Sequence, residues 1–253
     1  MENKLDVFGL TDTGAKRAGN EDSILINRKL ALFVVADGMG GHAFGEVASD
    51  LATKRINEVI ADRISAADTS SNNDEDILNI IRSAMEAAHT TVFDYSCQLP
   101  DKEVMGTTVS LMLFRNSKAF VAHVGDSRIY RLRNAGMEKL TVDHTEAQHL
   151  ADIGALVGSE VENHRTSHVL TRVLGVANML RPDYSVLETQ EADRFLLSSD
   201  GLFRVLDVDT VSAIMALEVP SREKCRILIE KTLQGGAPDN VSVIVVQPSR
   251  SDA

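Results

Sequence analysis

The stretch Ala31-Leu-Phe-Val-Val-Ala-Asp37-Gly38-Met39-Gly40-Gly41-His42 joins a continuous apolar run to an aspartate and three closely spaced glycines. Short apolar runs that end at glycine are typical of buried strands. Glycines after such a strand let the backbone come close to a bound ion or phosphate. We therefore predict a buried strand that ends in a metal-binding or phosphate-binding turn. An isolated Asp-Gly pair would more often mark a plain hairpin turn.

Two further apolar runs end in the same way. They read Ala119-Phe-Val-Ala-His-Val-Gly125-Asp126 and Arg194-Phe-Leu-Leu-Ser-Ser-Asp200-Gly201. Each of these aspartates, like Asp239 before Asn240, has a separate interpretation as an ordinary turn residue. As a set, however, they would crowd several carboxylates at the rim of a sheet, where they repel unless a hard cation joins them. Magnesium and manganese prefer such oxygen ligands, so the set predicts a metal site.

The composition is that of a soluble globular protein, with 43% hydrophobic and 25% charged residues among 253. The 26 Lys and Arg against 37 Asp and Glu give a net charge of −11, which speaks against nucleic acid or an anionic membrane as the partner. The two cysteines, Cys97 and Cys225, indicate a reducing compartment. We expect a cytoplasmic monomer with one catalytic domain over residues 1–253.

The order of predicted elements favours an α+β fold over a doubly wound parallel sheet, because strands and helices are grouped and do not alternate strictly. Continuous apolar strands need cover on both faces, which two packed sheets with helices outside would provide. We predict strands over 5–11, 23–27, 30–36, 184–187, 195–199 and 241–246, and a loop over 66–75. We predict helices over 46–64, 76–95 and 221–233, the last capped by Ser221, and an antiparallel meander of 107–115, 118–124 and 129–133.

A guanidinium precedes two acidic residues in Arg17-Ala-Gly-Asn-Glu21-Asp22, at the start of a predicted strand. Arginine suits bidentate binding of phosphate oxygens, and Asp22 could hold a metal close by. Taken alone the pattern is weak, because an arginine with neighbouring acids is usually a solvated turn.

Seven motifs stand together in one order along nearly the whole chain. They are Thr13-Gly14-x-x-Arg17-x-x-Asn20-Glu21-Asp22-Ser23, Ala36-Asp37-Gly38-Met39-Gly40-Gly41-His42, Gly106-Thr107-Thr108, Val124-Gly125-Asp126-Ser127-Arg128-Ile129-Tyr130, Leu170-Thr171-Arg172-Val173-Leu174-Gly175, Ser199-Asp200-Gly201-Leu202 and Asp239-Asn240-Val241-Ser242. In this set the sequence resembles the metal-dependent protein phosphatases of the type 2C class, especially the compact bacterial serine/threonine phosphatases.

The resemblance implies a four-layer α-β-β-α sandwich of two mostly antiparallel sheets, with a metal centre at one end. It implies two core Mn²⁺ or Mg²⁺ ions, and a third as in bacterial members. The residues implied as metal ligands are Asp22, Asp37, the Gly38 carbonyl, Asp126, Asp200 and Asp239. Asp37 would bridge the two core ions, and Asp126 with Asp200 would hold the third. Glu21 would act through water, and Arg17 would be the catalytic residue that grips the substrate phosphate.

The implied reaction is hydrolysis of phosphoserine or phosphothreonine in proteins phosphorylated by a Ser/Thr protein kinase. A hydroxide that bridges the metals would attack phosphorus directly, without a phosphoenzyme. Met39 stands where eukaryotic relatives have a histidine proposed as general acid, and methionine cannot donate a proton. The role of His42 stays open. Residues 144–174 resemble the family's flap beside the active site, which we expect to help select the substrate.

Three alternatives remain at this point. The chain could be a pseudophosphatase that binds a partner without turnover, although such proteins usually lose metal carboxylates. It could be a dedicated phosphatase of an anti-sigma-factor antagonist, which only the substrate would distinguish. Asp12-Thr13-Gly14 matches the aspartic-protease signature, but those enzymes bring together two such triplets, and this chain has one.

Overall fold

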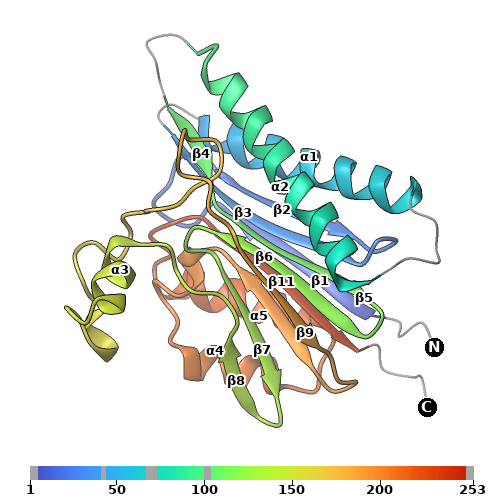
Figure 1. Cartoon of the computed structure of the whole chain (residues 1–253). Coiled ribbons are helices and arrows are strands. Elements are labelled where there is room, and N and C mark those ends of the chain that lie inside the picture. Colours follow the sequence, from blue (N-terminus) through green and yellow to red (C-terminus); the bar gives the residue numbers. More distant parts are fainter. Residues whose placement is uncertain (1–4, 41–43, 67–72, 100–103, 249–253) are drawn as a thin grey trace.

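The computed structural model describes residues 5–40, 44–66, 73–99 and 104–248. Within these residues two β-sheets pack face to face, and helices cover the outer face of each sheet (Figure 1). The predicted α-β-β-α sandwich is therefore confirmed. Gly41, His42 and most of the loop predicted over 66–75 lie outside the described residues.

The first sheet has the strand order β2-β3-β5-β6-β9, and a short strand β4 pairs with β3. Its strands are β2 (Asp22–Asn27), β3 (Leu32–Gly40), β4 (Met105–Thr107), β5 (Val109–Arg115), β6 (Lys118–Val124) and β9 (Asp183–Glu188). Helices α1 (Phe44–Ala66) and α2 (Asp74–Ser96) cover its outer face. Along β3, Leu32 and Val34 pack under these helices, whereas Phe33 and Val35 pack against the other sheet. Both faces of the strand are buried, which explains its continuous apolar run.

The second sheet has the strand order β1-β11-β10-β7-β8. Its strands are β1 (Leu5–Asp12), β7 (Arg128–Arg133), β8 (Gly136–Lys139), β10 (Arg194–Ser198) and β11 (Val241–Pro248). Helices α4 (Val208–Ala216) and α5 (Ser221–Gln234) cover its outer face. Three rings, Phe33, Phe114 and Phe195, meet edge to face between the two sheets, with centroids 5.9 and 5.3 Å apart. This apolar layer fixes how the sheets sit on each other.

The predicted meander is wrong in its third strand. β5 and β6 form an antiparallel hairpin, but β7 pairs with β10 and β8 in the other sheet. Residues 125–127 carry the chain from one sheet to the other, and Gly125 has the positive φ of +106° that this crossing requires. The side chains explain the choice, because Ile129 faces the layer between the sheets while Tyr130 and Leu132 pack towards α4 and α5.

Other differences from the prediction concern the second sheet and its helices. β8 and α4 have no counterpart among the predicted elements. The N-cap of α5 is Pro220, and Ser221 is the first helical residue. The Ser221 hydroxyl does not cap the helix but donates to Asp6 in β1. Sequence alone could not show this bond, because its partners are 215 residues apart.

Most of residues 144–174, the segment predicted as a flap, lies outside the sandwich and contains the short helix α3 (Glu146–Asp152) (Figure 1), while Leu174 at its end is part of the core under α1 and α2. Isolated bridges hold the base of this flap. Thr145 pairs with Leu170, and Leu174 pairs with Thr107 at the end of β4. The flap is thereby rooted at the end of the sheets where the aspartates gather.

Asp6 provides a test of how α5 is joined to its sheet. Its carboxylate accepts bonds from the Ser221 amide (2.7 Å), the Ser221 hydroxyl (2.6 Å) and Gln247 Nε2 (2.8 Å). Burial would raise the pKa of Asp6, but these bonds outweigh it and hold the pKa below the usual value of 3.8. We expect Asp6→Asn to lower the free energy of unfolding by about 1.5–3 kcal/mol at pH 7.

The pH dependence follows from the same shift. A lowered carboxyl pKa contributes stability that is present above roughly pH 4 and is lost as the pH falls through the folded-state value. Urea denaturation should therefore show a large gap between wild type and D6N at pH 7 and a smaller gap at pH 3. D209N, at an exposed acid in α4, should cost less than about 1 kcal/mol. An equal gap at both pH values would contradict this account.

Candidate metal centre

Asp22 and Asp37 face each other across the antiparallel pair of β2 and β3. Asp22 is 8% exposed, and Asp37 is half-buried at the end of its sheet. Ser199 donates a 2.8 Å hydrogen bond to one oxygen of Asp22. Among the described residues, the other oxygen, Oδ1, is buried with no hydrogen-bond partner. A buried carboxylate oxygen of this kind costs free energy unless something else binds it.

The motif Gly106-Thr107-Thr108 holds the backbone of Asp37. The Asp37 amide donates to Thr108 Oγ1 (2.9 Å), and the Asp37 carbonyl accepts from the Thr108 amide (2.8 Å) and the Thr107 hydroxyl (3.0 Å). Thr108 Oγ1 also lies 2.7 Å from the hydroxyl of Ser127, in the turn that carries Asp126. One threonine thus links the backbone of Asp37 to the crossing between the sheets.

Gly38 follows Asp37 in a position that only glycine fits. A Cβ on Gly38 would lie 2.0 Å from the carbonyl oxygen of Gly45, at the start of α1. The Gly38 amide donates a 3.1 Å hydrogen bond to the carbonyl of Glu21. The Glu21 side chain packs against Gly45, so Glu21 lies next to the predicted ligands.

Asp200 and Asp239 come from the second sheet, after β10 and before β11. Arg204 Nε donates to Asp200 (2.9 Å) and lies 3.6 Å from Asp239. Arg17 Nη2 lies 2.9 Å from Asp239 Oδ1 and 3.0 Å from its Oδ2. The two arginines therefore neutralise these two carboxylates. The guanidinium of Arg17, which we predicted to grip a phosphate, is in this structure paired with a predicted metal ligand.

Asn240 fastens the segment that carries Arg17. Its side-chain nitrogen donates to the carbonyls of Thr13 (2.8 Å) and Gly19 (2.9 Å). Its side-chain oxygen accepts from the amide of Glu21 (2.9 Å). The loop between β1 and β2 is thereby closed over the end of β11, beside Asp239.

Burial and mutual repulsion act on these carboxyl groups together. Burial raises the pKa of Asp22 to about 7, and the nearby charges of Asp200 and Asp239 add to the rise. Burial raises the pKa of Asp37 well above its usual range, and four neighbouring aspartates raise it further: Asp22, Asp200, Asp126 and Asp239. The pKa of Asp126 is raised by burial and then by Asp200 and Asp143. The structure thus brings the four other predicted aspartates close enough to Asp37 to raise its pKa.

The residues fit a hard divalent cation by their chemistry. The donors are carboxylate oxygens, the centre of the group is buried, and Asp22 Oδ1 has no protein partner in the described residues. Within those same residues, however, no three acidic, histidine or cysteine side chains already surround one point as ligands would. Asp200 and Asp239 instead pair with Arg204 and Arg17, which agrees with the carboxylates not converging on one point. The assignment of individual ligands stays a prediction.

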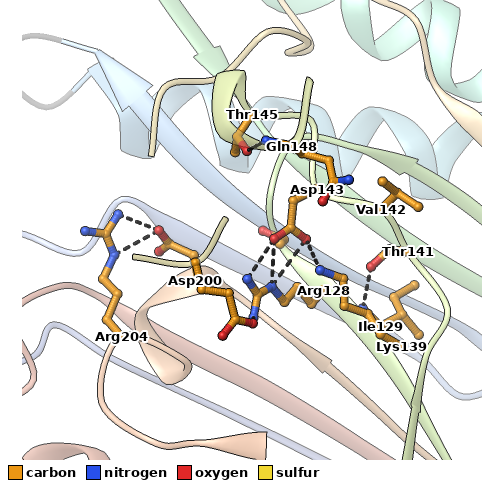
Figure 2. A network of polar contacts seen from close by, with 12 residues as sticks. Arg128, Ile129, Lys139, Thr141, Val142, Asp143, Thr145, Gln148, Asp200 and Arg204 are labelled. Carbon is orange, nitrogen blue, oxygen red and sulfur yellow. Dashed lines mark hydrogen bonds and ion pairs between the residues drawn. The ribbon is translucent and has the colours of Figure 1, made fainter. Parts of the chain in front are cut away.

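A cleft of about 740 Å³ opens beside the aspartates, between the flap and the start of α4. Asp126, Asp200 and Arg204 line one end of it. Along its side, Arg128 makes a two-pronged pair with Asp143 (2.7 and 3.0 Å), which Lys139 joins at 2.8 Å (Figure 2). Because Asp126 and Asp200 line the cleft, a polar ligand that enters it can reach the aspartates.

The comparisons with known proteins can be set against this geometry. The family model described as Protein phosphatase 2C matches residues 15–233. The chain belongs to the protein phosphatase 2C family. Asp239 lies beyond the matched segment, and its contacts with Arg17 and Arg204 are what place it with the other aspartates.

Two curated relatives are similar over most of the chain. Serine/threonine protein phosphatase PstP of Mycobacterium tuberculosis is 36% identical over 236 residues, which cover 93% of this chain and 43% of PstP. Protein phosphatase PhpP of Streptococcus pneumoniae is 28% identical over 255 residues, which cover 98% of this chain and 100% of PhpP. The chain thus spans less than half the length of PstP but the full length of PhpP.

Among solved structures, the catalytic domain of PstP in complex with two manganese ions has a TM-score of 0.82 to this chain. The two are 32% identical, and the match covers 97% of this chain and 99% of that one. As for the helices, none in the described part of the chain combines the length and the apolar character needed to cross a bilayer.

The sequence prediction missed three side chains that shape this phosphatase 2C site. Arg204 pairs with Asp200, and its position four residues after that aspartate was the available signal. Asp143 and Lys139 neutralise and brace Arg128, which the motif analysis had included without a role. No local pattern connects Arg128 with Asp143, since 15 residues separate them.

Thr108 can be tested by a nearly isosteric change. Thr108→Val removes the acceptor for the Asp37 amide and the partner of the Ser127 hydroxyl, in a site that is 1% exposed. We expect the free energy of unfolding to fall by about 1–3 kcal/mol. We also expect Mn²⁺ to bind about tenfold more weakly in a calorimetric titration, as for other residues that orient ligands.

Thr232→Val is the matched control, since Thr232 is also buried and its hydroxyl, within the described residues, donates to the carbonyl of Leu228 in α5 itself. It should lower stability without changing Mn²⁺ affinity. If T108V and T232V bind Mn²⁺ equally well, Thr108 has no role in orienting Asp37.

Proposed function

We propose that the chain is a metal-dependent protein serine/threonine phosphatase that hydrolyses phosphoserine and phosphothreonine. The observation that carries this proposal is the gathering of five aspartates from both sheets near Asp37, beside an open cleft, with Asp22 Oδ1 buried and without a hydrogen-bond partner in the described residues. The names of PstP and PhpP support the reaction class, and the manganese-bound PstP domain supports the cofactor. The whole chain would act as one catalytic domain.

In this proposal Asp22, Asp37, Asp200, Asp239 and the Gly38 carbonyl would hold two Mn²⁺ or Mg²⁺ ions, and Asp126 with Asp200 would hold a third. When bound, the ions lower the pKa of a coordinated water towards neutral pH and neutralise negative charge on the phosphate. Thr107 and Thr108 fix the backbone of Asp37, and Asn240 fixes the loop of Arg17. Each of these bonds is made by the protein before any substrate arrives, so the site is pre-organised.

Arg17 is half-exposed, with 49% of its side chain open to solvent, and faces Asp239 at the surface. It is placed to exchange this carboxylate for the oxygens of an entering phosphate, which a guanidinium can bind with two parallel bonds. Met39, also exposed, has no proton to give to the leaving oxygen. His42 lies outside the described residues, so the proton donor stays unassigned.

The substrate would be a phosphorylated segment of another protein, the product of a Ser/Thr protein kinase. Its backbone would lie in the cleft between the flap and α4, where Arg128, Asp143 and Lys139 form a fixed polar wall. We further propose that the chain works as a monomer in the cytoplasm. Its two cysteines, one exposed and one buried, are both free.

The first test is release of phosphate from a phosphothreonine peptide. We expect turnover by the wild type that requires added Mn²⁺ or Mg²⁺ and falls by at least about a hundredfold in Asp37→Asn, because the central ligand loses its charge. Asp209→Asn, on an exposed surface of α4, should leave the rate unchanged. A folded wild type that binds Mn²⁺ but releases no phosphate would instead identify a pseudophosphatase.

The role of Arg17 is tested by Arg17→Lys, which keeps the charge but removes the planar fork. We expect the KM for the phosphopeptide to rise by about tenfold, because a single ammonium replaces two parallel bonds to the phosphate. The neighbouring Lys16→Gln removes a charge that is exposed and should change KM little. Equal effects of R17K and K16Q would mean that Arg17 attracts phosphate only by general electrostatics.

A further inference from the structure

The turn Gly125-Asp126-Ser127 is held from one side by a histidine of the flap base. The His144 amide donates to the Gly125 carbonyl at 2.7 Å. In return the Gly125 amide donates to Nδ1 of the His144 ring at 3.1 Å. The two residues are 19 apart in sequence, and both are buried. The bond from Gly125 is the one through which a side chain fixes the start of this turn.

These contacts determine the protonation state of the ring. A backbone amide can only donate, so Nδ1 must be unprotonated and the proton of a neutral imidazole must sit on Nε2. Nε2 lies 3.0 Å from Asp183 Oδ2, which can accept that proton's bond. It also lies 3.2 Å from Arg172 Nη1, whose two hydrogens can instead bond to Asp183 Oδ1 and the Arg181 carbonyl. Burial lowers the pKa of His144 and outweighs the opposite effect of Asp183, and a lowered pKa favours the neutral ring.

The Nε2 side of the ring lies next to the returning segment of the flap base, which contains Thr171 and Arg172. Arg172 donates to Asp183 Oδ1 at 3.0 Å and to the carbonyl of Arg181 at 3.3 Å. The amide of Thr171 donates to the carbonyl of His144 at 2.9 Å. His144 thus contacts both the returning segment of the flap base and residues 125–127, which cross between the sheets.

Asp126 depends on this arrangement more than Asp22 and Asp37 do. Asp22 and Asp37 lie within paired strands, whereas Asp126 stands in a turn between two sheets. Gly125 lies tightly against Thr108, since a Cβ at this position would come within 2.5 Å of the Thr108 side chain. Loss of the Nδ1 acceptor would leave a buried amide unpaired, and the turn would have to shift to solvate it.

We propose that His144 is a positioning residue that fixes the turn at Gly125 and so aims the Asp126 carboxylate at a divalent cation. This inference rests on the metal centre of the proposed function. His144 itself touches neither cation nor substrate and acts through the backbone of residue 125. It makes the geometry of the third cation site depend on the base of the flap.

Two amide side chains separate the two bonds of the ring. In His144→Asn, Oδ1 takes the place of Nδ1 and can still accept from the Gly125 amide, while the bond to Asp183 is lost. In His144→Gln, Nε2 takes the place of the ring Nε2 and can still donate to Asp183, while the acceptor for Gly125 is lost. The control is His164→Gln, since His164 Nδ1 also accepts a backbone amide, that of Thr166, within the flap.

The experiment is a calorimetric titration of the full chain with MnCl₂. We expect Asp126→Asn to lose the weakest class of Mn²⁺ sites and His144→Gln to weaken that same class by about tenfold or more. His144→Asn should stay close to wild type, and His164→Gln should be unchanged. Unchanged Mn²⁺ binding in H144Q would overturn the inference, and so would H144N binding as weakly as H144Q.

A wild type that binds no Mn²⁺ would instead overturn the proposed function itself. A second measurement does not depend on whether the variants fold. In wild type labelled with ¹⁵N at histidine, nuclear magnetic resonance should show His144 neutral, with its proton on Nε2. A ring protonated on Nδ1 would rule out the bond from Gly125 and overturn the inference.

Discussion

Repulsion among buried carboxylates at one end of the two sheets is the constraint on which the rest of this structure depends. Asp22 and Asp126 are buried and Asp37 is half-buried beside them, and burial and the charge of Asp200 raise the pKa of all three. Carboxylates so placed separate unless their backbones are held. Hydrogen bonds from Thr108 hold two of the three segments, and a divalent cation would neutralise the charge they bring together.

The surroundings of the aspartates serve this constraint in different ways. Arg204 offsets charge on the second sheet, while Asn240 closes a loop over it without adding charge. Arg128 looks similar in the sequence but has a different role, because Asp143 and Lys139 surround it and hold it in the wall of the cleft (Figure 2). Position relative to the carboxylates decides whether an arginine here balances charge or shapes the cleft.

Much of the fold and of the aspartate cluster could be predicted from the sequence, because the ends of several buried strands are recognisable as apolar runs that stop at Asp beside Gly. That pattern predicted Asp37, Asp126 and Asp200 as neighbours, and the sandwich followed from strands buried on both faces. Local patterns could not show which sheet a strand joins. β7 follows β6 after a short turn, yet it belongs to the other sheet, where its side chains Tyr130 and Leu132 are buried under α4 and α5. The partner of Ser221 was hidden for the same reason, since Asp6 lies 215 residues away.

Because the aspartates are divided between the sheets, neither sheet alone can form the whole cluster. β2 and β3 bring two of them, the segments next to β10 and β11 bring two more, and the crossing turn brings Asp126. A cation that needs ligands from both halves binds only after the halves have docked, so its binding free energy adds to the stability of the docked state. Interactions that are absent from the folding transition state slow unfolding and leave the folding rate unchanged. A metal bound only after docking would therefore slow the parting of the sheets without speeding their first encounter, and the lifetime of the folded chain would follow the metal supply of the cell.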